Sequence, residues 1–196
     1  MHHLYHTHGF ILHSSPFGEA NRVFRIFTKE LGLINASAQG VRYLKSKLRY
    51  SLHDFSFAEL SLVRGKEFWR VTGAIKQINI HEALRGNPEI RAVFTRVFAL
   101  LDRLLSGEEK NENLFNYLSE AVRFALAKKD SDILVRNFEY ILVLRILFSL
   151  GYLGSSPDTS VFVESPFWSD DLLADMNTVM ARILEEINKS LKESQL

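Results

Sequence analysis

The apolar residues of this 196-residue chain change their spacing near residue 80, and that change limits the fold more than any other feature. Up to Ile80 they come in short runs with partial alternation, and turn residues such as Ser15-Pro16-Phe17-Gly18 separate the runs. This pattern predicts five strands, at residues 4–14, 20–28, 33–39, 52–63 and 67–79. Beyond Ile80 the apolar spacing becomes helical, so the two halves differ in class.

Five short strands near the N-terminus predict a small closed barrel, and the oligonucleotide-binding (OB) barrel is the commonest five-stranded form. The side chains of the last predicted strand should alternate between the barrel core and the outer surface. The side expected to pack into a core holds Trp69, Val71, Gly73 and Ile75. The side expected to carry charge holds Phe68, Arg70, Thr72 and Lys76.

The second half predicts an antiparallel bundle of helices. Its third helix, at about Asp132 to Leu150, is apolar nearly all round, which is typical of a helix at the centre of a bundle. Its last helix should begin after Ser169, a good N-cap residue. Residues 153–168 between them show no clear period and are expected to form an irregular loop. The predicted fold is therefore α+β, with a domain at residues 1–80 and a helical domain at residues 81–196.

A cluster of cations marks the first domain. The segment from Gly40 to Arg49, called the basic segment below, carries Arg42, Lys45, Lys47 and Arg49 together with Tyr43. Cations packed this closely repel one another unless an anion lies across them, and aromatic rings can stack on bases. A solvated charge run on a loop is the alternative interpretation.

The distribution of charge along the chain favours the nucleic-acid interpretation. Residues 1–80 hold eleven Lys and Arg against five Asp and Glu, whereas residues 81–196 hold thirteen against eighteen. A basic half suits a polyanion, and we expect the acidic half not to bind it directly. The chain has no cysteine, which excludes disulfides and thiolate metal sites and fits a reducing cytoplasm. Its longest apolar run is too short to span a bilayer.

Motifs for catalysis are incomplete in this sequence. Gly65-Lys66 is not part of a phosphate-binding P-loop, because Leu60 and Glu67 stand where a glycine and a hydroxyl are needed. His81-Glu82 is not a zinc-protease helix, because Arg85 stands in place of the second histidine. We therefore expect no catalysis, no cofactor and no metal. His6 and His8 share a strand face but lack a third ligand, so we interpret them as surface histidines.

Arg145 is unusual because its neighbours on the predicted third helix are apolar. Most such arginines extend to solvent or pair with an internal carboxylate. A sharper hypothesis is that Arg145 receives the terminal carboxylate of a partner's apolar tail. The aromatic residues expected to complete that site are Phe138, Phe148 and Tyr152.

The order of several segments resembles the RecO family of bacterial recombination mediators. In the first half these segments are Gly9-Phe10-Ile11-Leu12, Phe17-Gly18-Glu19-Ala20-Asn21-Arg22, Phe27-Thr28-Lys29-Glu30-Leu31-Gly32-Leu33 and the basic segment with Lys45-Ser46. In the second half they are Leu84-Arg85-Gly86-Asn87-Pro88, Asn137-Phe138-Glu139-Tyr140 and Leu150-Gly151-Tyr152. Many RecO proteins carry a four-cysteine zinc site after the last of these, and this chain has no cysteine there. It also looks shorter than typical members.

The resemblance implies an OB domain, a helical domain, binding and annealing of single-stranded DNA, and help in loading recombinase. It implies as partners single-stranded DNA, RecR, the acidic C-terminal tail of single-strand DNA-binding protein and RecF, in the cytoplasm at the nucleoid and without a membrane. The predicted DNA-binding residues are Arg22, Arg42, Tyr43, Lys45, Lys47, Arg49, Arg70 and Lys76. The alternative function is a non-catalytic interaction scaffold with little DNA affinity.

Overall fold

The computed structural model describes residues 3–128, 133–154 and 156–193, apart from the side chains of residues 190, 191 and 193. The chain forms two compact units. Unit 1 contains Met1–Arg85 and Phe98–Glu112, and unit 2 contains Gly86–Val97 and Asn113–Leu196. The division into domains at residue 80 stays a prediction. Residues 98–112 belong to the predicted helical domain, but their contacts place them in unit 1 together with the strands.

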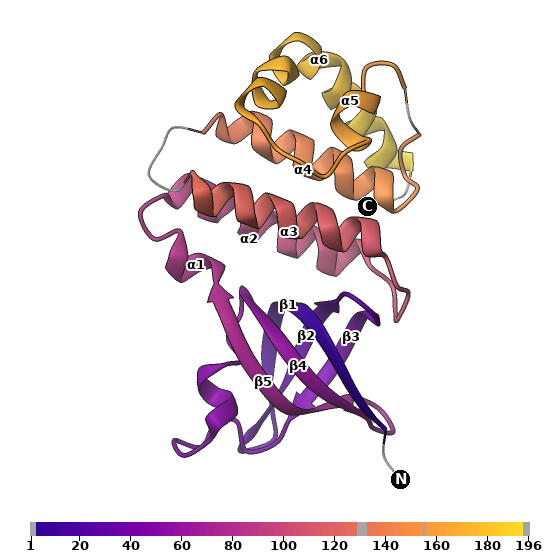
Figure 1. Ribbon diagram of the computed structural model, residues 1–196. Coiled ribbons are helices and arrows are strands. Elements are labelled where there is room, and N and C mark those ends of the chain that lie inside the picture. Colours follow the sequence, from indigo (N-terminus) through magenta and orange to yellow (C-terminus); the bar gives the residue numbers. More distant parts are fainter. Residues whose placement is uncertain (1–2, 129–132, 155, 194–196) are drawn as a thin grey trace. The chain divides into compact units, whose positions relative to one another are not determined.

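Unit 1 contains a closed five-stranded barrel with the order β1-β2-β3-β5-β4 (Figure 1). Its strands are β1 (Leu4–Phe17), β2 (Asn21–Thr28), β3 (Gly32–Ala38), β4 (Ser56–Arg64) and β5 (Trp69–Asn79). The long β1 pairs with β4 through its first half and with β2 through its second half, and a bulge between Ile11 and His13 bends it. A short parallel contact between β3 and β5 closes the barrel. The predicted OB barrel is confirmed.

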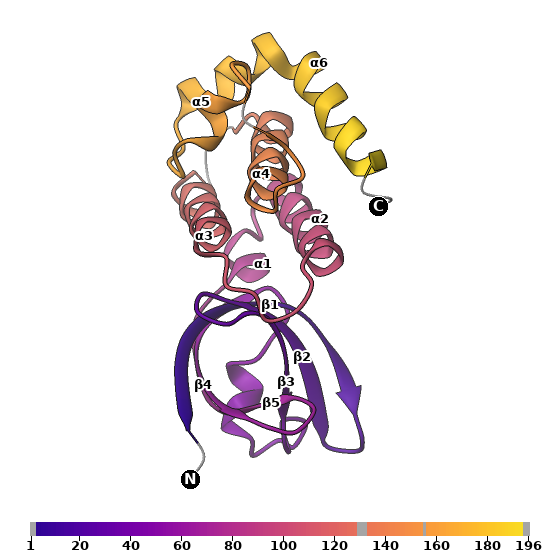
Figure 2. The same ribbon diagram turned by 90° about the vertical axis from the view of Figure 1, so that its right-hand side faces the viewer.

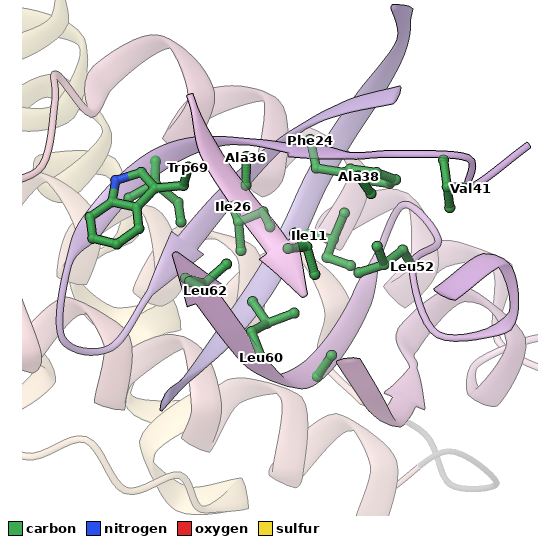
Figure 3. Close-up of a cluster of buried hydrophobic side chains, with 13 residues drawn as sticks. Ile11, Phe24, Ile26, Ala36, Ala38, Val41, Leu52, Leu60, Leu62 and Trp69 are labelled. Carbon is green, nitrogen blue, oxygen red and sulfur yellow. The ribbon is translucent and has the colours of Figure 1, made fainter. Parts of the chain in front are cut away.

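The barrel interior is filled by aliphatic side chains that alternate along the strands (Figure 3). The central ones, including Ile11, Ile26, Ile34 and Leu60, are fully buried, and Trp69 contributes its indole to the same cluster. Each buried aliphatic side chain stabilises the fold by about 1.5–3 kcal/mol relative to exposure. The inward alternation is therefore what fixes the register of the strands.

One prediction for β5 is wrong. Trp69 and Val71 are buried as expected, but the Ile75 side chain is 62% exposed. The pairing of β4 with β5 shifts between Ser61 and Leu62, so β5 carries an extra residue there. The extra residue reverses the alternation, which turns Ala74 toward the core and Ile75 outward.

Residues 98–112, which complete unit 1, are fixed to the barrel by polar contacts. The Arg25 Nε donates to an Asp102 carboxylate oxygen at 2.7 Å, and the Trp69 indole N–H donates to Glu108 at 3.0 Å. Gly32, at the start of β3, has φ of +68° and lies under this segment, so that a Cβ there would be 2.2 Å from the Glu109 carbonyl oxygen. Position 32 therefore needs glycine for its backbone angle and for space.

Unit 2 is helical. It contains the first residues of α2 (Pro88–Leu104), then α3 (Glu112–Ala127), α4 (Val135–Ser149), α5 (Ser160–Val163) and α6 (Asp170–Glu193) (Figure 2). Asp132, where the third helix was predicted to begin, lies outside the described residues. α4 is buried on nearly all sides, as its apolar sequence predicts, and packs against α5 and α6.

Two further sequence predictions for unit 2 concern the start of α6 and the segment before it. The hydroxyl of Ser169 accepts a hydrogen bond from the Leu172 N–H at 3.0 Å, so the predicted N-cap of α6 is confirmed. Residues 153–168, predicted as an irregular loop, contain the single turn of α5. No helix in the described part of the chain is long and apolar enough to cross a membrane.

Candidate nucleic-acid interface

The basic segment lies in the long connection between β3 and β4, where the chain leaves the barrel and returns to it. This connection includes the 3₁₀ helix η1 (Lys47–Tyr50). The connection is anchored at both ends, because Val41 and Leu52 insert their side chains into the barrel core. The Arg42 N–H also donates to the Ala20 carbonyl at 3.0 Å, and the Gly40 N–H donates to the Asn21 amide oxygen at 2.8 Å. The segment is thus held in place while its middle stays on the surface.

The basic segment and Tyr50, which directly follows it, expose both cations and aromatic rings. Tyr43 and Tyr50 are 65% and 68% exposed. Lys45, Lys47 and Arg49 are exposed as well, and no carboxylate in the described part of the chain pairs with them. Exposed unneutralised cations raise the local concentration of a polyanion, and exposed rings can stack on its bases.

Arg22, Arg42 and Arg49 line one pocket of about 330 Å³, together with His53. Arg22 comes from the start of β2, whereas the other residues come from the connection, so the fold joins positions that are far apart in sequence. The Arg42 Nη1 donates to the Glu19 carbonyl at 2.8 Å, which fixes its guanidinium beside the turn between β1 and β2. His53 was not among the predicted site residues.

The turn between β1 and β2 also meets the turn between β4 and β5. The rings of Phe17 and Phe68 lie edge to face with centroids 5.8 Å apart, and Phe17 is 48% exposed. In OB barrels these two turns flank the oligonucleotide-binding surface. Sequence reasoning missed Phe17, although an aromatic residue between Pro16 and Gly18 in a turn is a signal for an exposed ring.

The remaining two predicted DNA-binding residues lie on β5. Arg70 is exposed and pairs across the barrel closure with Ser37 of β3. The Lys76 Nζ lies 3.5 Å from a Glu82 carboxylate oxygen, so its charge is partly compensated within unit 1. Arg70 therefore remains the better candidate for contact with a phosphate.

Arg145 contacts the backbone of unit 2 in this structure, and the hypothesis that it binds a partner's carboxylate stays a prediction. Its side chain is fully buried. Its Nε donates to the Phe162 carbonyl at 2.7 Å, and its Nη atoms donate to the carbonyls of Ser165, Pro166 and Phe167 at 2.7–3.1 Å. The guanidinium also lies 4.3 Å from the Trp168 ring centroid. A partner's tail could reach it only if this loop opened.

The electrostatics of Arg145 fit that structural role. Burial lowers the pKa of Arg145 to about 10, partly offset by the nearby Tyr117, and the guanidinium therefore stays charged at neutral pH. Burial likewise raises the pKa of Tyr117. A buried cation needs partners, and here the backbone carbonyls supply them in place of a carboxylate.

The aromatic residues predicted to bind a tail are separated in unit 2. Phe138 is fully buried and packs against Phe94 and Trp168, so it belongs to the core. Phe148 lines a pocket of about 290 Å³, and Tyr152 is 37% exposed. Phe148 and Tyr152 are thus at least partly exposed, unlike Phe138, and their contact with a partner's tail stays a prediction.

Metal ligands are not gathered anywhere in residues 3–128, 133–154 and 156–193: no three His, Cys, Asp or Glu side chains there are placed to hold an ion. His6 Nδ1 lies 3.2 Å from the Ser61 hydroxyl, and the His8 ring stacks on Phe57 with centroids 5.7 Å apart.

Comparison with known proteins adds to this geometry. A family described as "Recombination protein O N terminal" matches residues 1–79, which end with β5. The chain is 29% identical over 140 residues to a DNA repair protein RecO of Alkaliphilus metalliredigens and 30% identical over 161 residues to one of Desulforamulus reducens. The chain belongs to the RecO family.

These matches cover more of this chain than of its relatives. They span 70% of this chain and 56% of the Alkaliphilus RecO protein, and 79% of this chain and 57% of the Desulforamulus one. A DNA repair protein RecO of Dehalococcoides mccartyi is 30% identical over 141 residues, with 72% of this chain and 55% of that protein covered. The chain thus spans a little over half the length of these RecO relatives.

Proposed function

We propose that this chain acts in DNA repair and recombination by binding single-stranded DNA on the barrel of unit 1 and promoting the pairing of complementary strands. The observation that carries the proposal is the basic segment, which the barrel core anchors at Val41 and Leu52. Its Lys45, Lys47 and Arg49 are exposed, and none of them pairs with a carboxylate among the residues that the structure describes. Its position on an OB barrel, in a chain of the RecO family, supports the same function.

The proposed mechanism needs no bond to be made or broken. Cations that lie against the phosphates of two strands lower the repulsion between them, and hence the barrier to pairing. Exposed rings such as Tyr43 and Tyr50 can hold bases stacked and unpaired until the complementary strand arrives. We accordingly propose a cytoplasmic, non-catalytic protein associated with the nucleoid.

The proposed partners follow from the family. They are RecR, RecF and the C-terminal tail of single-strand DNA-binding protein, and their combined effect is to load recombinase on DNA. Because Arg145 and Phe138 are buried, a tail that docks on unit 2 would have to use surface residues such as Phe148 and Tyr152.

The test is the salt dependence of oligonucleotide binding. Contact with about five phosphates of a single strand predicts a slope of log K against log salt of roughly −3.5, at about −0.7 for each neutralised phosphate. Replacing Arg42, Lys45, Lys47 and Arg49 by alanine should weaken every sequence alike and flatten this slope.

A control variant should replace four exposed cations elsewhere, Arg103, Arg123, Arg136 and Arg182, which changes the net charge equally. It should keep the slope. If the unchanged protein shows a slope near zero, the phosphate-contact mechanism fails and the chain is a scaffold that binds other repair proteins. A second assay measures the rate of annealing of two complementary strands. Acceleration by the unchanged protein that is lost in the four-alanine variant would support the mediator function over the scaffold function.

A further inference from the structure

The pocket formed by Arg22, Arg42, Arg49 and His53 differs in kind from the exposed cations around it. Its remaining lining residues, Val41 and Leu52, are only 3% and 5% exposed and belong to the barrel core. None of the six lining residues is acidic. Three arginines therefore line one partly apolar hollow, where charges interact more strongly than in bulk water.

Two of the arginines are oriented before any ligand binds. The Arg22 Nη2 donates to the Ser14 carbonyl at 3.3 Å, and its Nε is buried without a hydrogen-bond partner in the described part of the chain. The Arg42 Nη1 donates to the carbonyl oxygens of Gly18 and Glu19, and in the described part of the chain its Nε and Nη2 have no side-chain hydrogen bond assigned. A buried N–H without an acceptor costs about 1–3 kcal/mol, so an incoming oxygen would be stabilised.

The carboxylates nearest to the pocket are directed to other groups. Asp54 and Glu82 line an adjoining hollow that also contains Arg22 and His53. Asp54 accepts a hydrogen bond from the Ser14 hydroxyl at 2.5 Å, and Glu82 lies near Lys76. No ion pair between either carboxylate and Arg22 is described, so the arginines are not neutralised from that side.

We propose that this pocket binds one phosphate group of a nucleic-acid strand and so fixes the position of that strand on the barrel. The inference rests on the proposed function and adds a defined subsite to it. A terminal phosphate has three non-bridging oxygens and an internal phosphodiester has two, and each of these oxygens can accept more than one hydrogen bond from the planar guanidinium groups. The lysines of the basic segment contact phosphates as mobile point charges, and the pocket supplies the one contact with fixed geometry.

The first measurement uses inorganic pyrophosphate alone, titrated into the full chain against sodium chloride of equal ionic strength. We expect saturable binding by calorimetry. Arg22→Gln and Arg49→Gln should each weaken it about tenfold or more, as expected for loss of a charge-assisted bond. Arg103→Gln removes the same charge from an exposed site outside the pocket and should change nothing. Arg49 is exposed, so its variant remains informative if Arg22→Gln unfolds the barrel.

The second measurement identifies the source of the phosphate with oligonucleotides that end in a 5′-phosphate, a 3′-phosphate or hydroxyl groups only. Tighter binding of one phosphorylated end, lost in Arg49→Gln, assigns the pocket to a strand terminus. Equal binding of all three, with displacement by pyrophosphate, assigns it to an internal phosphate.

Two outcomes would overturn the proposal, and they are distinguishable from each other. If oligonucleotides bind with the expected salt slope while pyrophosphate neither binds nor competes, the phosphate pocket is refuted and the proposed function stands. If pyrophosphate binds but no oligonucleotide does, the assignment of the pocket to nucleic acid is refuted together with the proposed function.

Discussion

Replacing Arg145 by alanine should destabilise unit 2 by about 3–5 kcal/mol, because each hydrogen bond from a charged donor contributes about 1.5–3 kcal/mol and only part of the sum over four bonds is reached. The change deletes four hydrogen bonds and leaves the carbonyl oxygens of Phe162, Ser165, Pro166 and Phe167 without their donor. Each unsatisfied buried carbonyl costs about 1–3 kcal/mol. Three of these bonds are only partly buried, so water will replace some donors and the full sum will not be reached.

Urea unfolding can measure this loss in unit 2 alone. The chain has two tryptophans, Trp69 in unit 1 and Trp168 in unit 2, and the Arg145 guanidinium lies over the second ring. In a Trp69→Phe background the fluorescence reports Trp168. With a urea slope of about 2 kcal/mol per M, the midpoint should fall by about 2 M.

Two further variants separate charge from shape at this position. Arg145→Lys keeps the charge but has no planar fork, so it should recover part of the stability and remain below the unchanged protein. Arg123→Ala, which removes an exposed arginine paired only with Glu120 on the same helix, should cost less than about 0.5 kcal/mol. A loss below about 1 kcal/mol in Arg145→Ala would refute the structural role and restore the tail-binding hypothesis.

The pH dependence supplies an independent check on Arg145. Its pKa in the folded chain, about 10, is lower than its ordinary value, so the folded state disfavours the charged form. That penalty is constant below pH 10, where folded and unfolded chains are both protonated, and is relieved only as the pH rises through the folded pKa. The destabilisation by Arg145→Ala should therefore be the same at pH 6 and at pH 9. A marked change across that interval would contradict the assignment.

Three other predictions concern the barrel and metals. Gly32→Ala should lower the free energy of unfolding by more than about 2 kcal/mol, and Gly18→Ala should lower it by about 1 kcal/mol. Both positions have positive φ, but of the two only position 32 lacks space for a Cβ. Equal thermal midpoints of the two variants would refute the clash at position 32. Ile75→Thr should leave the midpoint nearly unchanged, whereas Val71→Ala should lower it by several degrees, because the bulge exposes only the former. Strong chelator should not shift the thermal midpoint, and a fall of several degrees would reveal a metal site.

Much of the fold could be predicted because it depends on local spacing. The five strands lie within a few residues of their predicted positions, since alternation of apolar residues reports which side of a barrel wall is buried. The all-round apolar character of α4 likewise indicated a central helix. The exposed face of β5 could not be predicted beyond Thr72, because one extra residue in a ladder reverses the side chains that follow it, here as far as the second shift opposite Phe57 and Ala58, and leaves no mark in composition.

The sequence by itself determined the class of each half, the concentration of positive charge in the first half and the density of cations in the basic segment. Tertiary structure alone decided which of those cations act together. Arg22 joins Arg42 and Arg49 because the connection from β3 folds back on the turn before β2, a contact between residues about twenty positions apart. Arg145 looked like a binding residue because sequence shows its apolar neighbours on α4 but not the carbonyl groups of a distant loop that surround it. A partner supplied by the backbone has no sequence signature, since every residue carries the same carbonyl group.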